Sequence, residues 1–281
     1  MAKEKRNIMK NKISSILINL TLFIIATITI SPLLWMLFVS FMPSGSSSSY
    51  PPPFLPNEIT IEHYKILFTK LNLLNYFLNS LVLSISISLI SVLVNSMAGF
   101  AFAKLFFPHK DKLFRFLLAS LVVPGQVTML PLFFILNKLG FINTYWGLII
   151  PGMASIFGIF LIKQYLYSIP DTLIEAARID GASDFTIYYK IILPLCKPIL
   201  VTLTIFTFIG TWNDFLWPLI IMTDDSMYTL PVALANLMGE HALDTELMMA
   251  GSVLTTLPII ILFMFLQRYY IEGITAGSIK E

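Results

Sequence analysis

Long apolar stretches, separated by short segments that hold most of the charge, run through the whole chain. A helix needs about 20 apolar residues to cross about 30 Å of hydrocarbon, because each residue advances about 1.5 Å. Six stretches between charged residues are long enough, at roughly 13–41, 77–103, 115–138, 138–163, 197–224 and 246–268. The pattern predicts an all-α membrane protein with six transmembrane helices, which places both ends of the chain on one side.

The basic residues are distributed unevenly between the two sides that this topology defines. Fifteen of the 18 Lys and Arg residues lie before the first stretch, between the second and third, between the fourth and fifth, or after the sixth. The other side has only Lys65, Lys70 and Lys138. Because basic residues are enriched in cytoplasmic segments, both termini are predicted to be cytoplasmic.

These boundaries divide the chain into consecutive parts. They are a cytoplasmic N-terminus at 1–12, a first helix at 13–42, an external link at 43–71, a transmembrane core at 72–268 that carries a cytoplasmic loop at 164–197, and a cytoplasmic tail at 269–281. The link is rich in Ser, Gly and Pro, which cannot continue a helix. The first apolar stretch is about twice as long as the 7–15 residues of a signal peptide, so we expect a retained helix. Cleavage near Ser44 is the alternative.

Composition narrows the class of protein further. Of the 281 residues, 57% are hydrophobic and 12% are charged, about half the charge of a typical soluble domain. This excludes a disordered chain, a coiled coil and an ordinary cytosolic enzyme. The single Cys196 and the three dispersed His residues form no metal-ligand spacing, and no Gly-rich nucleotide-binding motif is present in the sequence.

Small and polar residues recur at spacings of three and four along the apolar stretches, which places each set on one helical face. The sets are Ser80, Ser84, Ser88, Ser91 and Asn95; Gly147, Pro151, Ala154 and Gly158; and Thr204, Thr207, Thr211 and Asp214. Small residues allow close packing of membrane helices. Such faces can also line a water-filled path, and the pattern leaves both interpretations open.

Asp214 is the one acid well inside a predicted span. It lies about 16 residues, or roughly 24 Å, from the cytoplasmic edge of the fifth stretch. A carboxylate that faces lipid costs at least a few kcal/mol, so we expect this side chain to face protein or water. A structural acid near the outer headgroups and a contact to a polar solute are the two interpretations.

The cytoplasmic loop between the fourth and fifth stretches has a helical pattern of its own. Pro170 fits the first position of a short helix, and Gly181 fits the left-handed residue that ends it. Ser183 fits the cap of a second helix, which we expect to run to about Ile192 and to end at Pro194. Such a hairpin exposes apolar side chains. It is therefore expected to lie on its own helix bundle or lipid interface, or to dock on a soluble partner.

Two segments of this loop carry a motif, Glu175-Ala176-Ala177-Arg178-Ile179-Asp180-Gly181-Ala182-Ser183 and Ile191-Ile192-Leu193-Pro194. The pattern resembles the EAA loop of ABC importer permeases. The proline-rich link at 51–56, Ala101-Phe102-Ala103-Lys104, Trp212-Asn213-Asp214-Phe215 and the tail at 273–280 resemble the carbohydrate-uptake branch of that family. The resemblance is greatest to the smaller of its two permease subunits, the maltose and glycerol-3-phosphate permease type.

The resemblance implies the transmembrane domain of a type I ABC importer, a transport subunit rather than an enzyme. Its implied partners are a second, different permease subunit, an ATPase dimer on the cytoplasmic side and a solute-binding protein outside, with no nucleic acid. ATP and Mg²⁺ belong to the ATPase, and this chain binds no cofactor. Coupling to the ATPase is assigned by resemblance to Glu175, Ala176, Ala177, Arg178, Asp180, Gly181, Leu193 and Pro194.

The implied substrate is a sugar or oligosaccharide. Sugars are held by carboxylates, amides and aromatic rings, so the candidate substrate-path residues are Thr207, Thr211, Trp212, Asn213 and Asp214. An ABC permease for glycerol phosphate, an amino acid or a peptide is the alternative. A secondary transporter is disfavoured because the sequence has no internal repeat and one intramembrane acid. A membrane-embedded enzyme is disfavoured because no paired catalytic acids are present.

Overall fold

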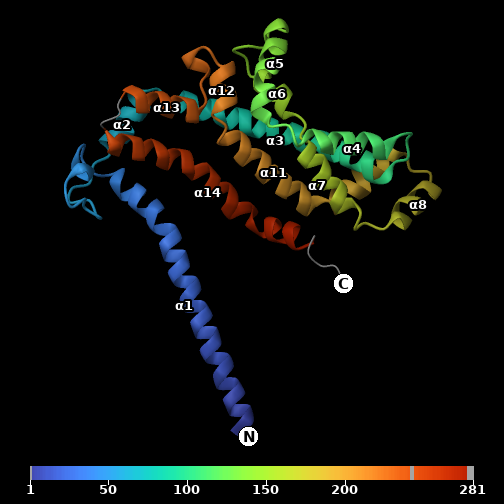
Figure 1. Ribbon diagram of the computed structural model, residues 1–281, viewed down its shortest axis with the longest axis horizontal. Coiled ribbons are helices and arrows are strands. Elements are labelled where there is room, and N and C mark those ends of the chain that lie inside the picture. The colour runs from blue at the N-terminus through green and yellow to red at the C-terminus, as the bar shows by residue number, and fades with distance from the viewer. Residues whose placement is uncertain (1, 241–243, 277–281) are drawn as a thin grey trace. The chain divides into compact units, whose positions relative to one another are not determined.

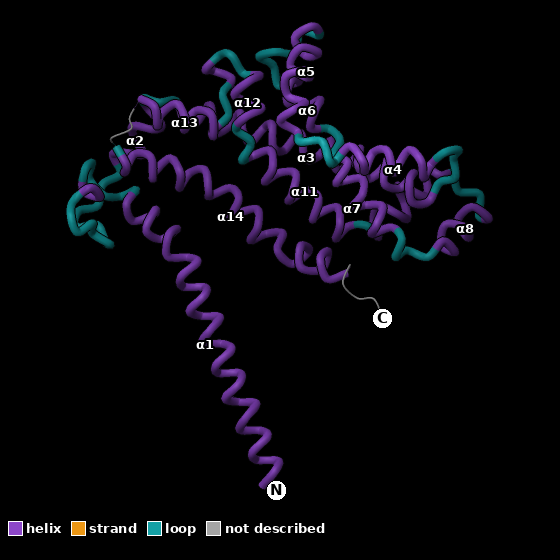
Figure 2. The backbone as a smooth tube through the Cα atoms, viewed as in Figure 1, coloured by secondary structure: helices purple, strands orange, loops and turns teal. Residues whose placement is uncertain are grey.

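The computed structural model describes residues 2–240 and 244–276, and it describes side chains for 14–237 and 244–267. Within these residues the regular structure is entirely helical (Figures 1 and 2). Contacts divide the chain into two compact units, residues 1–71 with 237–254 and residues 72–236 with 255–281. The predicted all-α architecture is therefore confirmed.

The first unit contains the N-terminal helix and residues 43–71, the segment predicted to be an external link. Its elements are α1 (Ala2–Val39), the 3₁₀ turn η1 (Ser46–Ser48), α2 (Glu62–Thr69), the end of α13 (Leu230–Glu240) and the first part of α14 (Thr245–Ala276). Along α1, the hydroxyls of Thr21, Thr27 and Thr29 donate to carbonyl oxygens four residues earlier in the helix. Because these bonds satisfy the hydroxyls within α1, the helix presents an apolar surface suited to lipid.

A buried acid holds the link in this first unit. Both carboxylate oxygens of Glu246 accept backbone hydrogen bonds, from Gly45 at 3.1 Å and from Ser47 at 2.7 Å. The ring of His63 is also buried, and its Nε2 lies 2.9 Å from the carbonyl oxygen of Met42. The start of α14 is thereby tied to the segment that follows α1.

The second unit contains the rest of the chain. Its elements are α3 (Leu73–Lys104), α4 (Lys110–Ser120), α5 (Gly125–Lys138), α6 (Trp146–Gly152), α7 (Ile156–Leu166), α8 (Asp171–Ile179), α9 (Asp184–Ile187), the π-helical turn η2 (Tyr188–Ile192), α10 (Leu193–Leu195), α11 (Lys197–Trp212), α12 (Leu216–Ile221), the 3₁₀ turn η3 (Asp225–Met227), most of α13 and the rest of α14. The long helix α3 packs lengthwise against α7 and α11 (Figure 1). It is the central element of this unit.

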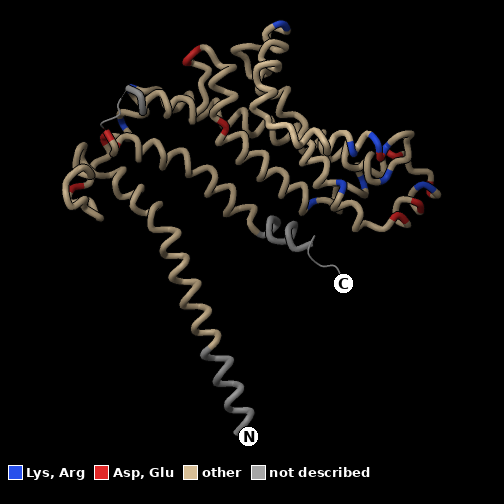
Figure 3. The backbone as a smooth tube through the Cα atoms, viewed as in Figure 1, with Lys and Arg blue, Asp and Glu red and all other residues tan. Residues whose placement is uncertain are grey.

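Glycine and asparagine allow α3 and α7 to approach closely. A Cβ atom at Gly99 would lie 2.6 Å from Cγ2 of Ile162, and one at Gly158 would lie 2.7 Å from Nδ2 of Asn95. We call the set Ser80, Ser84, Ser88, Ser91 and Asn95 of α3 the polar stripe. At Asn95 the polar stripe is therefore a packing interface. Figure 3 shows that most Lys and Arg residues of this unit lie around α4 and α8, at one end of α3. Such clustering agrees with the charge asymmetry of the sequence.

Four helical segments are long and apolar enough to span a membrane, at Ser14–Val39, Leu73–Lys104, Trp146–Leu166 and Thr245–Gln267. Two bent helix pairs raise the number to six if each pair is one span. One pair is α4 with α5, bent by 102°, and the other is 184–195 with α11, bent by 79°. These six candidate segments lie within the described residues.

The structure corrects the form of two predicted spans. The third is not one straight helix, because Pro124 lacks an N–H group and forms the N-terminal cap where α5 begins. The fifth does not continue as a helix to residue 224. Instead α11 ends at Trp212, and α12 begins again at Leu216. Asp214 therefore lies in a break between two helices rather than inside one.

Candidate functional site

The hairpin of α8 and α9 forms through three local signals. Pro170 was predicted as the first helical residue but is the N-terminal cap of α8, so the helix begins one residue later, at Asp171. Gly181 adopts a left-handed φ of +82°, as predicted, and ends the helix. The hydroxyl of Ser183 accepts a hydrogen bond from the backbone N–H of Thr186 and caps α9, also as predicted. The sequence thus specifies the turn from local chemistry alone.

One face of the hairpin packs on its own helix bundle. Ile174 of α8 and Ile187 of α9 are buried in a core that also contains Leu166 of α7 and Leu203 of α11. Ala177 packs against the same core while remaining partly exposed. This contact fixes the hairpin to the second unit and confirms one of the two predicted placements.

The opposite face of the hairpin is exposed and carries large apolar side chains among charged and polar ones. Ile179 is 87% exposed, and Leu173 and Phe185 are also exposed. A salt bridge of 2.9 Å joins Arg178 to Asp184 across the turn. Of the predicted coupling residues, six are exposed and two partly buried: Glu175, Ala176, Arg178, Asp180, Gly181 and Pro194 are exposed, and Ala177 and Leu193 are half-buried. An exposed apolar surface beside fixed charges is suited to docking on another protein.

The structure corrects the end of the second short helix. The helical path does not stop at Pro194. It passes from α9 through the π-helical turn η2 into α10, which ends at Leu195. Pro194 lies directly after the π-helical turn, within the first two positions of α10. The change of direction comes at Cys196 instead, between α10 and α11.

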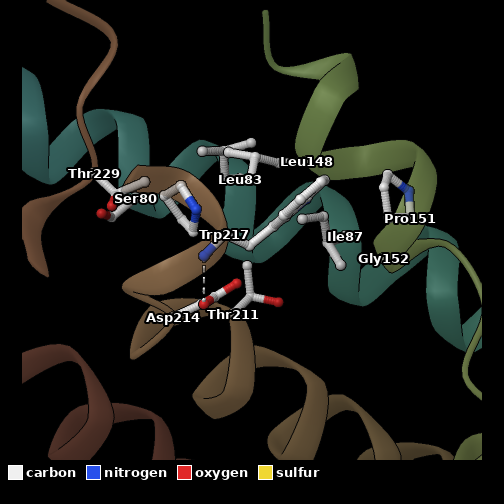
Figure 4. Close-up of a pocket in the computed structure, with 11 residues that line it drawn as sticks. Ser80, Leu83, Ile87, Leu148, Pro151, Gly152, Thr211, Asp214, Trp217 and Thr229 are labelled. Carbon is white, nitrogen blue, oxygen red and sulfur yellow. Dashed lines mark hydrogen bonds between the residues drawn. The ribbon is translucent and has the colours of Figure 1, made fainter. Parts of the chain in front are cut away.

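A pocket lined by both apolar and polar residues lies toward the other end of α3 (Figure 4), and we call it the polar pocket after its carboxylate and hydroxyl groups. Its cavity has a volume of about 230 Å³ and is lined by Ser80, Leu83, Ile87, Leu148, Pro151, Gly152, Thr211, Asp214, Trp217, Pro218 and Thr229. Oδ1 of Asp214 accepts a hydrogen bond of 3.4 Å from the backbone N–H of Trp217, at the start of α12. Oγ1 of Thr229 is buried and has no hydrogen-bond partner among the described residues. The pocket combines one carboxylate, three hydroxyls and an indole ring.

Hydrogen bonds from α3 position the segment that carries Thr229. The side-chain amide of Asn79 donates to the carbonyl oxygens of Ser226 and Tyr228, at 2.9 and 3.0 Å. The hydroxyl of Ser80 accepts from the backbone N–H of Leu230 at 2.7 Å. In the same segment, hydrogen bonds from the Ser226 side chain and backbone hold the pKa of Asp224 below its ordinary value. These contacts fix one wall of the pocket.

The structure brings together only part of the predicted substrate path. Thr211 and Asp214 line the pocket, whereas Thr207 and Asn213 do not. Trp212 is 0% exposed, stacks on Phe208, and donates from Nε1 to the carbonyl oxygen of Thr255 at 2.9 Å. Its ring therefore belongs to the core of this unit and offers no open face to a solute.

Three of the polar and aromatic lining residues, Ser80, Trp217 and Thr229, were not among the predicted site residues. Ser80 belongs to the polar stripe of the second span, so its spacing was a usable signal. Trp217 lies three residues after Asp214, but aromatic residues are common near membrane interfaces and gave no separate signal. Thr229 had none, because it reaches the pocket through contacts with residues far away in the sequence.

Residues 95–275, which include the hairpin and Asp214, match the protein family described as binding-protein-dependent transport system inner membrane component. The chain belongs to this family. Its members are transport components, which agrees with the prediction that the chain is not an enzyme. The resemblance seen in the loop motif is therefore confirmed at the level of the family.

Curated relatives extend the match over almost the whole chain. The arabinooligosaccharides transport system permease protein AraQ of Halalkalibacterium halodurans is 38% identical over 97% of this chain and 100% of its own length. The diacetylchitobiose uptake system permease protein NgcG of Streptomyces coelicolor is 31% identical over 91% of this chain and 85% of its own length. Both matches include the external link and the hairpin.

A solved structure shows the same fold. One chain of a bacterial ABC transporter involved in alginate import aligns with a TM-score of 0.79, covering 93% of this chain and 98% of that chain at 24% sequence identity. The fold is therefore that of an ABC importer transmembrane domain. A structural match at 24% sequence identity establishes the fold and not the substrate.

Proposed function

We propose that this chain is a permease subunit of an ATP-driven, binding-protein-dependent importer that moves a sugar or oligosaccharide across the cytoplasmic membrane. Family membership supports the transport class. The names of the curated relatives, which transport arabinooligosaccharides and diacetylchitobiose, support a saccharide as the substrate. In this proposal both termini are cytoplasmic, as the basic residues indicate.

The hairpin of α8 and α9 carries the proposal. It is a rigid surface element, buried on one face and exposed on the other, and it lies at the basic end of α3. Leu173, Ala176 and Ile179 of its exposed face recur at helical spacing and offer apolar contacts to a groove on an ATPase. The ATPase binds ATP and Mg²⁺ and performs the hydrolysis, while this chain binds neither.

The polar pocket is the proposed place where this chain contacts the sugar. A carboxylate accepts strong hydrogen bonds from hydroxyl groups, and Asp214 lies there beside the hydroxyl of Thr211. The cavity of about 230 Å³ is smaller than the roughly 300–1,000 Å³ of most ligand sites. We therefore assign it one wall of the path, and a second, different permease subunit supplies the rest. A solute-binding protein delivers the sugar from outside.

The hairpin assignment is tested in the purified importer, reconstituted into vesicles with its partner permease, ATPase and binding protein. Ile179→Glu places a charge on the exposed face, so we expect the ATPase to dissociate and sugar uptake to be lost. Phe106→Glu is the matched control, because Phe106 is 97% exposed on the loop after α3 and lies outside the hairpin. Full ATP-driven uptake by Ile179→Glu would refute the docking role.

A further inference from the structure

One face of α3 holds the hairpin at both of its ends. Ser96, Phe100 and Lys104 are spaced by four residues and therefore lie on the same side of the helix. Lys104 contacts the segment that leads into α8, and Ser96 and Phe100 both contact Tyr188, directly after α9. We call these three residues the grip face of α3.

At the start of the hairpin, the grip face holds the segment that leads into α8. The Nζ of Lys104 donates to the carbonyl oxygen of Ile169 at 2.7 Å and to Oδ1 of Asp171 at 2.6 Å. The Lys104 side chain is 4% exposed, whereas that of Asp171 is 73% exposed. A buried ammonium group is stabilised by its protein acceptors, because water cannot replace them when they are removed. The start of α8 is therefore tied to the last turn of α3.

At the end of the hairpin, the grip face holds the π-helical turn. The hydroxyls of Ser96 and Tyr188 lie 2.7 Å apart and form a buried hydrogen bond. The ring of Phe100 lies between the two polar contacts along the helix, with its centroid 5.7 Å from that of Tyr188. Phe100 also belongs to the core that contains Ile174 and Ile187. The hairpin is thus held to α3 at its start through Lys104 and at its end through Ser96 and Phe100.

The same helix reaches the polar pocket. Ser80, Leu83 and Ile87 of α3 line the cavity, and Ser80 lies about 36 Å from Lys104 at about 1.5 Å per residue. A continuous helix transmits an axial displacement from one end to the other. Helix α3 is therefore a continuous helical path between the hairpin and the pocket wall.

We propose that the grip face is the mechanical link of coupling and that Lys104 is its main positioning residue. This inference rests on the proposed docking of the hairpin on an ATPase. It adds that docking alone is insufficient, because the hairpin must also be held to α3 for its movement to reach the path. If the contacts between the grip face and the hairpin are lost, the ATPase remains bound and active, but less sugar is transported for each ATP hydrolysed.

The test measures sugar transported per ATP hydrolysed by the complete importer in vesicles. Lys104→Met removes both polar contacts but keeps an apolar stem, and we expect this ratio to fall roughly tenfold, as expected for the loss of a charge-assisted contact. Lys104→Arg keeps a charged donor and is expected to restore most of the ratio. Lys110→Met is the matched control, since the Nζ of Lys110 donates to the carbonyl oxygen of Leu105 at 3.0 Å and not to the hairpin.

Folding and docking are followed in the same samples through thermal stability and the amount of ATPase that copurifies. If Lys104→Met assembles poorly, two milder variants replace it. Asp171→Asn changes the exposed partner of Lys104, and Tyr188→Phe removes the hydroxyl that contacts Ser96. The proposed role of the grip face would be wrong if sugar transport and ATP hydrolysis fell in proportion in these variants. The amount of sugar transported per ATP hydrolysed would then be unchanged. The docking proposal has a separate test, because it fails if Ile179→Glu retains full sugar uptake.

Discussion

Oδ1 of Asn95 accepts a hydrogen bond of 2.9 Å from the backbone N–H of Ser155, which joins α3 to the cap of α7. Nδ2 of the same amide donates to Oγ of Ser91 at 2.7 Å. Both the oxygen and the nitrogen of this buried amide therefore form hydrogen bonds within the protein. In this half of α3 the polar stripe holds helices together, while at Ser80 it lines a pocket.

The close approach at Asn95 makes Gly158 sensitive to any side chain. We expect Gly158→Ala to lower the free energy of unfolding by about 1–3 kcal/mol, because its Cβ would lie 2.7 Å from Nδ2 of Asn95. Thermal unfolding in detergent measures the change. Gly210→Ala is the control, since a Cβ there meets nothing within 4 Å. Equal midpoints for the two variants would contradict the packing role of Gly158.

Gly181 is required for its backbone conformation and not for space. No atom lies within 4 Å of a Cβ built at this residue, but its φ of +82° costs an ordinary side chain about 1–2 kcal/mol. We expect Gly181→Val to reduce sugar uptake strongly and Gly181→Asn to reduce it less, because Asn tolerates this region.

Gly140 provides the matched control for that pair of variants. It has a φ of +74° and likewise no neighbour within 4 Å, but it lies between α5 and α6. Gly140→Val should carry a similar local strain and retain uptake. Similar losses of uptake at the two glycines would show that strain itself, and not the coupling turn, is responsible.

Asp214 can be tested without disturbing the start of α12. Asp214→Asn keeps an oxygen that can accept from the N–H of Trp217 but removes the charge. We expect uptake at limiting sugar to fall roughly tenfold, the effect of weakening a charged hydrogen bond to a hydroxyl. Asp225→Asn is the control, because Asp225 does not line the pocket. Unchanged uptake by Asp214→Asn would remove this carboxylate from the path.

The external link should loosen when Glu246 is removed. Glu246→Ala leaves the N–H groups of Gly45 and Ser47 without their acceptor, which costs about 1–3 kcal/mol for each group that stays buried. We expect faster protease cleavage between residues 44 and 50 and a lower unfolding midpoint. Glu62→Gln, at an exposed acid of α2, should change neither quantity.

The sequence was sufficient for features that depend on neighbours along the chain. Apolar length predicted the membrane-spanning class, and Gly181 and Ser183 predicted the turn of the hairpin, because left-handed backbone and helix caps are set within a few residues. The bends were not predicted. Pro124 was visible in the sequence, but nothing in an apolar stretch says whether a proline is accommodated or begins a new helix.

Which of two neighbouring aromatic residues lines the pocket was decided by tertiary structure. Trp212 and Trp217 lie five residues apart in one segment, but the first is closed inside the core and the second lines a pocket. Periodicity assigns a residue to a face of its helix, but the partner that covers the face comes from elsewhere in the chain. Asn79 of α3 positions the segment of Thr229, which lies about 150 residues later in the sequence. Lys104 likewise binds the start of α8, which is distant in the sequence. The sequence determined the helices and the turn, and packing between distant segments decided which side chains meet.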